Sequence, residues 1–405
     1  MLDLKLMRRE PERVREALAR RRADEPLDRI LELDSRRREL LPRVEELRAS
    51  QNQANDAIKE ARSSGGDADA LIAEMRAVAG QVKQLQAEVA TIDDQLAAAL
   101  GGVPNLPDES APPEDEVLRE VGEAGASGPD HLELLGGLVD LEAGARVAGS
   151  RFAYLKGSLV FLELALVRWA LEELDSHGFT PVVPPVLARE EALFGTGFLP
   201  DTEQQIYRVP DDDLYLVGTS EVPLASLHAG EIAEESSLPL RYAGFSSCFR
   251  RESGAGGKDT RGIFRVHQFE KVEMFSFVRP EDSHDEHERL LSIEESLLQA
   301  LDIPYRVVNI ALHDLGASAA KKYDLEAWLP GQERFRELTS CSNTTDFQAR
   351  RLDARYRPAG GKGPRHLHTL NGTAVTGRTI IAIVENHGLD VPEVLRRHGA
   401  PARLA

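Results

Sequence analysis

Two neighbouring runs hold a dense set of ionic side chains that could do chemistry. Cys248-Phe-Arg-Arg-Glu252 is followed by a glycine-rich turn and then by Arg265-Val-His-Gln-Phe-Glu-Lys-Val-Glu273. Arg250 and Glu252 are expected to share one face of a strand, because side chains alternate along a strand. Ionic groups in such a place need an ionic ligand or one another. A bound phosphate with an ammonium group would satisfy both signs, and the plain alternative is a set of salt bridges at a sheet edge.

A second cluster, Arg336-Glu-Leu-Thr-Ser-Cys-Ser-Asn343, offers oxygen ligands. In an extended segment Glu337 and Thr339 share one face, and Ser340 adds a hydroxyl. Oxygen ligands of this kind suit Mg²⁺ bound to nucleotide phosphates. Taken by itself, this cluster is a weak signal.

A third run, Asn371-Gly-Thr-Ala-Val-Thr-Gly-Arg378, predicts a polar turn before an apolar helix or strand, with Arg378 available to face an anion. Two other runs resemble functional motifs only superficially. Gly254-Ala-Gly-Gly-Lys-Asp-Thr260 lacks the spacing of a phosphate-binding loop. Asp282-Ser-His-Asp-Glu-His-Glu288 has two histidines three residues apart, which favours a solvated helix start over a metal site.

The clearest periodic signal predicts two long helices between residues 30 and 100. Apolar residues follow an a/d heptad pattern over about four heptads, at Leu71, Met75, Val78, Val82, Leu85, Val89, Ile92, Leu96 and Ala99. A less regular seam runs from Ile30 to Ala61, interrupted by Arg37 and Gln51. Ser63-Ser-Gly-Gly-Asp67 predicts the turn between them. The result is an antiparallel coiled-coil arm of roughly 45 Å, in which Pro42 is expected to kink the first helix or start a new turn.

Such an arm is either a dimerisation element or a projection that grips a long partner. Several arginines of the first helix are available for phosphate contacts: Arg36, Arg37, Arg38, Arg43 and Arg48. Charged helix faces are more often merely solvated, so the charges alone do not decide between the two roles.

The chain is expected to divide into residues 1–103 with the helical arm at about 27–100, a Pro- and Gly-rich linker at 104–130, and a second domain at 131–405. Strand-like runs outnumber helical ones in the second domain and lack βαβ alternation, which favours an α+β fold with an antiparallel sheet. Helices are predicted at Leu159–Leu174 and His284–Leu301, and strands at Thr180–Val183, Leu214–Val217, Arg241–Phe245, Phe264–Phe277, Tyr305–Ile310 and Thr379–Val384.

Composition narrows the class of protein. The 405 residues carry a net charge of −19, which argues against a general nucleic-acid binder and leaves room only for local basic surfaces. Two cysteines cannot form a disulfide framework, and no apolar run approaches a membrane span. The N-terminus has charges where a signal peptide needs an apolar core. We therefore expect a cytoplasmic protein with neither a membrane nor a DNA partner.

Set in order, these runs resemble the three signature motifs of class II aminoacyl-tRNA synthetases, and specifically those of the bacterial seryl-tRNA synthetase family. The matching segments are Gly178–Pro185 for motif 1 at the dimer interface, Phe249–Glu273 for motif 2, Gly377–Glu385 for motif 3, Leu216–Leu224 for the serine-binding loop, Asp314–Asp324 and Thr344–Arg350. The resemblance covers nearly the whole chain, including the arm.

The resemblance implies a homodimer that forms seryl-adenylate from L-serine and ATP and transfers serine to the 3′ end of tRNA(Ser). It implies catalytic roles for Arg250 and Arg378, with Arg250 on the α-phosphate and the serine carboxylate and Arg378 on adenine and the γ-phosphate. The implied ATP-binding residues are Arg250, Arg251, Glu252, Arg265, Val266, Phe269, Glu337, Leu338, Thr339, Ser340 and Arg378.

For the remaining ligands the resemblance implies Mg²⁺ on Glu337 and Ser340, and the tRNA variable arm on the coiled coil. The implied serine-binding residues are Thr219, Ser220, Glu221, Arg250, Glu273 and Thr373. Glu273 would meet the serine ammonium and Thr373 its hydroxyl. A site that hydrogen-bonds the substrate hydroxyl rejects alanine strongly, because its own polar groups would be left unpaired.

Three departures from the family pattern keep alternatives open. The run Asn371–Arg378 is one residue shorter than the pattern, His313 stands where glycine is frequent, and the segment after Glu385 is shortened. Neutral drift explains such changes, and so does a second copy of the enzyme with a reshaped pocket, serving inhibitor resistance or a biosynthetic pathway. A carrier-protein ligase would lack the arm, an inactive paralogue would lack the site arginines, and an archaeal-type zinc enzyme would need a Cys/His ligand set.

Overall fold

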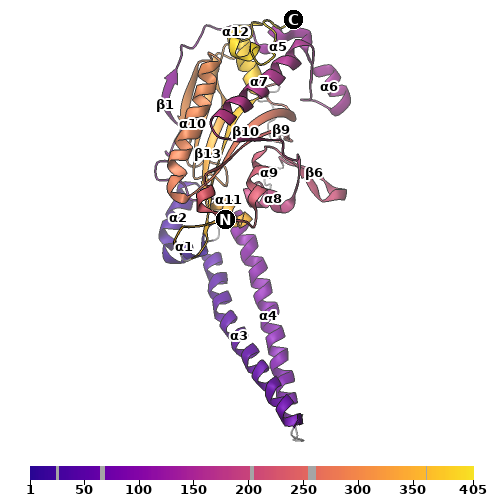
Figure 1. Ribbon diagram of the computed structural model, residues 1–405, viewed down its shortest axis with the longest axis vertical. Helices are drawn as coiled ribbons and strands as arrows, with labels where there is room; N and C mark the ends of the chain where they lie inside the picture. Colours follow the sequence, from indigo (N-terminus) through magenta and orange to yellow (C-terminus); the bar gives the residue numbers. More distant parts are fainter. Residues whose placement is uncertain (24–26, 64–68, 201–204, 254–260, 362) are drawn as a thin grey trace. The chain divides into compact units, whose positions relative to one another are not determined.

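The computed structural model describes residues 1–405 except 24–26, 64–68, 201–204, 254–260 and 362. These residues form two compact units, Leu2–Val103 and Pro104–Ala405, the latter also including Met1 (Figure 1). The run Gly254–Thr260 and most of the turn expected at Ser63–Asp67 lie outside the described residues. In the described part, no helix is long and apolar enough to cross a membrane.

The N-terminal unit consists of helices. α1 (Leu4–Arg9) and α2 (Pro11–Arg20) precede the long helices α3 (Leu27–Ser63) and α4 (Asp69–Gly102). α3 and α4 pack along each other as an antiparallel pair (Figure 1). Every position of the heptad seam in α4 is buried or half-buried, with Val82, Ile92 and Leu96 most enclosed. The predicted helical arm is confirmed.

Ion pairs join the two long helices at and beside an interruption of the apolar seam. Arg37 interrupts the apolar seam, and its Nε lies 2.5 Å from Asp93 Oδ1 of α4. Arg36 pairs with Glu88 across the same interface. α3 continues through Pro42 from Leu27 to Ser63, so the proline does not interrupt the helix, and the alternative expectation of a kink stays a prediction.

The second unit is built on an eight-stranded sheet in the order β1-β11-β12-β13-β16-β10-β9-β4. All neighbours pair antiparallel except β4 with β9. The strands are β1 (Glu116–Val121), β4 (Thr180–Val182), β9 (Leu240–Phe249), β10 (Gln268–Val278), β11 (Tyr305–Asn309), β12 (Lys321–Leu329), β13 (Arg334–Thr345) and β16 (His368–Thr376). The predicted α+β class with an antiparallel sheet is confirmed.

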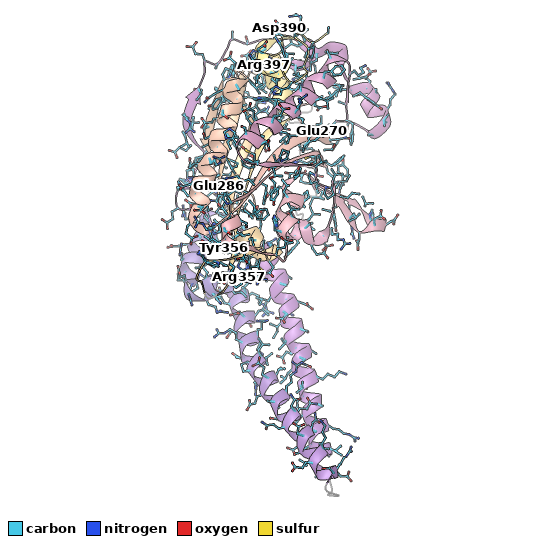
Figure 2. All side chains as sticks on the ribbon, viewed as in Figure 1. Glu270, Glu286, Tyr356, Arg357, Asp390 and Arg397 are labelled. Atoms are coloured by element: carbon cyan, nitrogen blue, oxygen red, sulfur yellow. The ribbon has the colours of Figure 1, made fainter. Side chains whose placement is uncertain are left out.

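Three helices pack against this sheet and close its core: α7 (Ser158–Ser176), α10 (Ser283–Ala300) and α12 (Gly377–His387). Their apolar faces bury Trp169, Leu297 and Ile383 with Tyr305 and Phe179 in one cluster. Figure 2 shows how densely side chains fill the layer between α10 and the strands, where the labelled Glu286 of α10 reaches Arg241 of β9.

The structure corrects several local predictions. Residues 104–130 do more than link domains: they carry β1, whose backbone completes the sheet edge by pairing with β11. The run Thr379–Val384 is helical, because the side chains of Thr376 and Thr379 form a capping box that starts α12. His287 is not solvated: it is buried, its Nε2–H donates to Cys341 O over 3.1 Å, and its ring stacks on Tyr323.

Candidate active site

The β9–β10 hairpin presents one row of functional side chains. Phe269, Lys271 and Glu273 alternate with their neighbours along β10 and therefore share a face. Lys271 and Glu273 are buried and form an ion pair of 2.5 Å. Phe269 lies under the guanidinium of Arg250, whose Cζ is 5.3 Å from the ring centroid. The row thus changes from an aromatic surface to a buried charge pair within five residues.

Arg250 and Glu252 lie beyond the end of β9, so the expectation that they share a strand face is wrong. Glu252 has a left-handed backbone (φ 50°), which turns the chain after Arg251. Both side chains nevertheless reach the same pocket. Arg250 Nε donates to Gly218 O over 3.2 Å, and Glu252 pairs with Arg265 over 3.2 Å. Arg251 is exposed and does not line the pocket.

A pocket with about 990 Å³ of open space, its mouth included, gathers most of the residues predicted for ATP. The predicted residues in its wall are Arg250, Glu252, Arg265, Val266, Phe269, Glu337, Leu338, Thr339, Ser340, Thr373 and Arg378. They come from the β9–β10 hairpin, β13, β16 and the start of α12, which the sheet order places side by side. Residues separated by more than a hundred positions therefore face one space.

Glu337 is the acidic group of β13 that faces this pocket, and 46% of its side chain is exposed. Partial burial raises its pKa, but Lys322, Arg378 and Arg250 outweigh that effect and hold the pKa below its usual range. Glu337 and Thr339 do not share a face as expected. Leu338 is an extra residue opposite β12, and beyond this bulge the Thr339 hydroxyl contacts Glu294 of α10 at 3.4 Å.

The run Asn371–Arg378 was predicted to be a turn, but all of it except the last two residues is a strand. Asn371–Thr376 belongs to β16, paired with both β10 and β13, and α12 begins at Gly377. Arg378 therefore stands in the first turn of α12. Its guanidinium carbon lies 4.5 Å from the Phe264 ring centroid, and its Nη1 is 3.6 Å from Glu337.

The residues predicted to bind serine form a buried network beside the pocket rather than part of its wall, except Arg250 and Thr373. Lys271 Nζ donates to Thr219 Oγ1 over 3.1 Å, and Thr373 Oγ1 lies 3.4 Å from Glu273. Ser220 bonds Ser246 over 2.7 Å. This network joins the serine-binding loop to β10 and β16.

Glu221 is the most confined acid of that network. Gln348 and Asn371 both donate to its Oε1, over 2.7 and 3.0 Å. Burial, together with the nearby Glu273 carboxylate, raises the pKa of Glu221 to about 7, while the Gln348 hydrogen bond opposes the rise. Burial also raises the pKa of Glu273, and the cation of Lys271 opposes that shift. Two carboxyl groups and one ammonium thus share a small enclosed volume.

Several residues of this site had no role predicted from the sequence. Lys271 was visible within motif 2, and its spacing of two from both Phe269 and Glu273 was a signal for a shared face. Phe264, which lies against Arg378 and Arg336, was expected to begin a strand, but β10 begins only at Gln268, so its place at the pocket could not be read from strand alternation. Gln348 and Asn371 become neighbours of Glu221 only through the fold. His313, one of the departures, lies 3.8 Å from Asp314.

Comparison with known proteins assigns both units. Residues 1–107 match the family model "Seryl-tRNA synthetase N-terminal domain", and residues 206–387 match "tRNA synthetase class II core domain (G, H, P, S and T)". A serine–tRNA ligase of Thermobifida fusca is 49% identical over 98% of this chain and 97% of its own length. The chain belongs to the seryl-tRNA synthetase family. Membership of this family confirms the predicted function of a serine–tRNA ligase.

Solved structures of this family agree over the full length. A seryl-tRNA synthetase from Pyrococcus horikoshii, crystallised with ATP, has a TM-score of 0.92 and 41% identity, covering 100% of this chain and 99% of its own. A cytoplasmic serine–tRNA ligase from Naegleria fowleri, in complex with AMP, has a TM-score of 0.87 and 34% identity, covering 100% and 98%. Both likenesses extend through the arm and the catalytic sheet together.

Proposed function

We propose that the pocket is where this chain activates L-serine with ATP, before transferring it to the 3′ end of tRNA(Ser). The observation that carries the proposal is the convergence of Arg250, Glu337 and Arg378 on one space, next to the buried Lys271–Glu273 pair. Cations and an aromatic surface suit a nucleotide, and enclosed carboxyl groups suit an amino-acid ammonium. The likeness to a synthetase crystallised with ATP supports the same assignment.

In this proposal the adenine ring lies between Phe269 and Arg378, with Glu252 near the adenosine. Phe269 offers a flat apolar face, and a guanidinium stacks well on aromatic rings. Arg250 and Arg265 lie on the same pocket wall and meet the phosphates, and Arg250 also holds the serine carboxylate. Two arginines aimed at one anion give bidentate, charge-assisted contacts that fix its orientation.

Mg²⁺ fits the oxygen atoms of Glu337 and Ser340. Both residues line the pocket, and surrounding cations keep the Glu337 carboxyl charged. A carboxylate and a hydroxyl are hard oxygen donors, the class that Mg²⁺ prefers when phosphates supply its other ligands. When bound, the ion would neutralise part of the charge on the ATP phosphates.

Serine is proposed to bind with its ammonium toward Glu273 and Glu221 and its hydroxyl toward Thr373. Thr219 and Ser220 hold the loop that carries Glu221. Lys271 Nζ lies between Glu273 and Thr219, so it fixes the carboxylate that receives the ammonium. A pocket of this polarity leaves groups unpaired when alanine replaces serine, which gives discrimination against alanine.

The chemistry follows from positioning alone. A serine carboxylate oxygen attacks the α-phosphorus, a new P–O bond forms, and the bond to pyrophosphate breaks, so that pyrophosphate leaves with its electron pair. Arg250 stabilises charge on the α-phosphate as the bond order changes. The tRNA 3′-terminal hydroxyl then attacks the adenylate carbonyl and AMP leaves. Neither step requires a covalent enzyme intermediate.

The helical arm is proposed to contact the backbone of the tRNA variable arm. Arg38 and Arg43 are exposed on α3, whereas Arg36 and Arg37 already pair with acids of α4. Local arginines of this kind can bind RNA phosphates although the chain as a whole is acidic. The homodimer is proposed to form at motif 1, where Val183 exposes a large apolar side chain, as do Phe161 and Leu164 on the preceding helix α7.

The experiment that tests the function charges unfractionated tRNA with serine, alanine, threonine, cysteine and glycine in parallel. Serine attached only to serine tRNA supports the proposal. Adenylate formation without any charging would overturn the tRNA step and favour the carrier-protein ligase. Arg38→Ala combined with Arg43→Ala is expected to lower charging while pyrophosphate exchange stays unchanged.

A specialised copy of the enzyme is a second candidate, favoured by the shortened run 371–378. β16 bulges at Ala374, between Thr373 of the serine network and Arg378 of the pocket. The loss of one residue there shortens the chain between the proposed serine-binding Thr373 and the proposed ATP-binding Arg378. Resistance to a seryl-adenylate analogue that inhibits an ordinary relative supports this candidate. Equal sensitivity, in a cell with no other serine-charging enzyme, would dismiss it.

A further inference from the structure

A buried His–Glu pair lies outside the pocket and outside every role assigned so far. His131 begins the short helix α5 (His131–Leu135), and Glu385 stands in the last turn of α12. They are 4% and 7% exposed, and His131 Nδ1 lies 2.9 Å from Glu385 Oε1. Neither residue lines the pocket. A buried imidazole–carboxylate pair of this kind needs an explanation, because an apolar pair would fill the same volume at lower desolvation cost.

The partners of this pair fix the position of the histidine proton. The backbone N–H of Ile263 donates to His131 Nε2 over 3.2 Å, so Nε2 must hold a lone pair. Nδ1 must then carry the proton and donate it to Glu385. The same carboxylate accepts from the backbone N–H groups of His131 and Gly331, over 3.2 and 3.0 Å. Only one tautomer of His131 satisfies all of these contacts.

The residues tied to α5 are the return limb of the motif 2 loop. Arg261 pairs with Asp130 over 2.7 Å, directly before the contact from Ile263 to His131. Gly262 has φ +79°, and a Cβ at that position would lie 2.2 Å from His131 Nε2. The imidazole therefore occupies the space beside a glycine, and residues 261–263 have little freedom to move away from α5.

This limb leads directly to the pocket. Phe264 follows Ile263, and its ring lies against the guanidinium of Arg378 at 4.5 Å. Arg378 Nε also donates to Phe264 O over 3.3 Å. Arg378 and Glu385 are seven residues apart on α12, close to two helical turns, so they point from one side of the helix. The loop is thus attached to both ends of α12. Phe264 contacts Arg378 at the start of the helix directly, and Ile263 is linked to Glu385 near its end through His131.

We propose that His131 is a positioning residue of the ATP site. Together with Glu385 it holds Ile263 and Phe264 in place, and Phe264 in turn holds Arg378 in the pocket wall that also includes Phe269. This inference rests on the proposed function, in which adenine binds between Phe269 and Arg378. It assigns a purpose to a pair of buried polar residues that contact neither substrate.

The test compares two amide replacements that imitate different ring nitrogens. The amide nitrogen of His131→Asn can replace Nδ1 and donate to Glu385, but no atom reaches the Ile263 N–H. The amide oxygen of His131→Gln can replace Nε2 and accept from Ile263. Loss of a partner for a buried backbone donor predicts about a tenfold rise in KM for ATP in His131→Asn. KM for serine should change less than twofold, and His131→Gln should restore most of the ATP affinity.

Pyrophosphate exchange at varied ATP and serine provides these constants, and His284→Asn on the exposed start of α10 is the matched control. Nitrogen-15 NMR of labelled histidine, with the His131 signal identified by its loss in His131→Asn, should report the Nδ1–H tautomer. If His131→Asn does not fold, Glu385→Gln is used instead. The amide N–H of the new side chain must face either the N–H groups of His131 or the backbone N–H of Gly331, so it cannot accept all of the hydrogen bonds that Glu385 accepts.

An Nε2–H tautomer would overturn the proposal, and so would equal changes in the ATP and serine constants or unchanged constants in a variant that melts earlier. Those outcomes leave the function of the pocket intact. Wild-type protein that exchanges no pyrophosphate with serine would instead overturn the proposed function together with the positioning role.

Discussion

The helical arm and the catalytic sheet each contain an ion pair with the same separation in very different surroundings. Arg37 and Asp93 lie 2.5 Å apart between α3 and α4, with 37% and 45% of their side chains exposed. Lys271 and Glu273 lie 2.5 Å apart on β10, with 9% and 2% exposed. Water screens the charges of the first pair, whereas the charges of the second pair are compensated by other protein groups. Distance alone therefore says little about what an ion pair contributes.

The difference explains how one chain divides its tasks. In the arm an apolar seam holds the helices together, so charged side chains on its surface can change partners, as the proposed contact with RNA requires. In the catalytic sheet the buried Lys271 and Glu273 hold one another, so removing one leaves the other buried without compensation. We expect substitutions of charged arm residues to act on stability or tRNA affinity by small amounts, and substitutions of charged site residues to act on adenylate formation by larger ones.

Arg378→Ala is expected to have the largest effect. The substitution removes a cation that faces Glu337 and one of the two guanidinium groups that lie against Phe264. Loss of one preorganised cation from a phosphoryl-transfer site costs about a thousandfold in kcat/KM. Pyrophosphate exchange measures it, with Arg38→Ala in the arm as the control that should leave exchange unchanged. A decrease of less than tenfold would contradict the role given to Arg378.

Pro42→Ala is expected to produce the next largest change, as a gain in arm stability. Pro42 sits inside α3, where proline lacks the N–H for a helical hydrogen bond and costs about 3 kcal/mol relative to alanine. Hydrogen exchange of the α3 amides should slow, while the amides of β10 keep their rates. Unchanged exchange in α3 would mean that the helix is already relaxed around the proline.

The same contrast shows what could be predicted from the sequence. The arm was predictable, because a heptad pattern is local and extends over many residues. The catalytic motifs were predictable as a set, through their resemblance to a family. The bulge at Leu338, the helical start of Thr379–Val384 and the neighbours of Glu221 were not predictable, because they depend on register and capping between distant segments. Lys271 could have been found from spacing alone.

The pH dependence of serine use is expected to have an intermediate effect. The pKa of Glu221 is raised to about 7, so below pH 7 the carboxyl is mostly protonated and above it mostly charged. Only the charged form attracts the serine ammonium, so kcat/KM for serine should fall about tenfold for each pH unit below 7. Initial-rate exchange from pH 5.5 to 8.5 measures the profile. Glu221→Gln should lower the plateau about tenfold and remove this slope; a variant that keeps the wild-type slope would assign the ionisation to another group.

The Arg37–Asp93 pair is expected to contribute least. A double-mutant cycle with Arg37→Ala and Asp93→Ala, followed by unfolding of the full chain, should give a coupling of about 0.5 kcal/mol that falls as salt is added. The corresponding cycle at Lys271 and Glu273 should give several times more, because either single change leaves a buried charge unpaired. If the two couplings were equal, burial would not be the property that separates the arm from the site. A coupling above 2 kcal/mol at Arg37 would mean that charge, rather than the apolar seam, aligns α3 with α4.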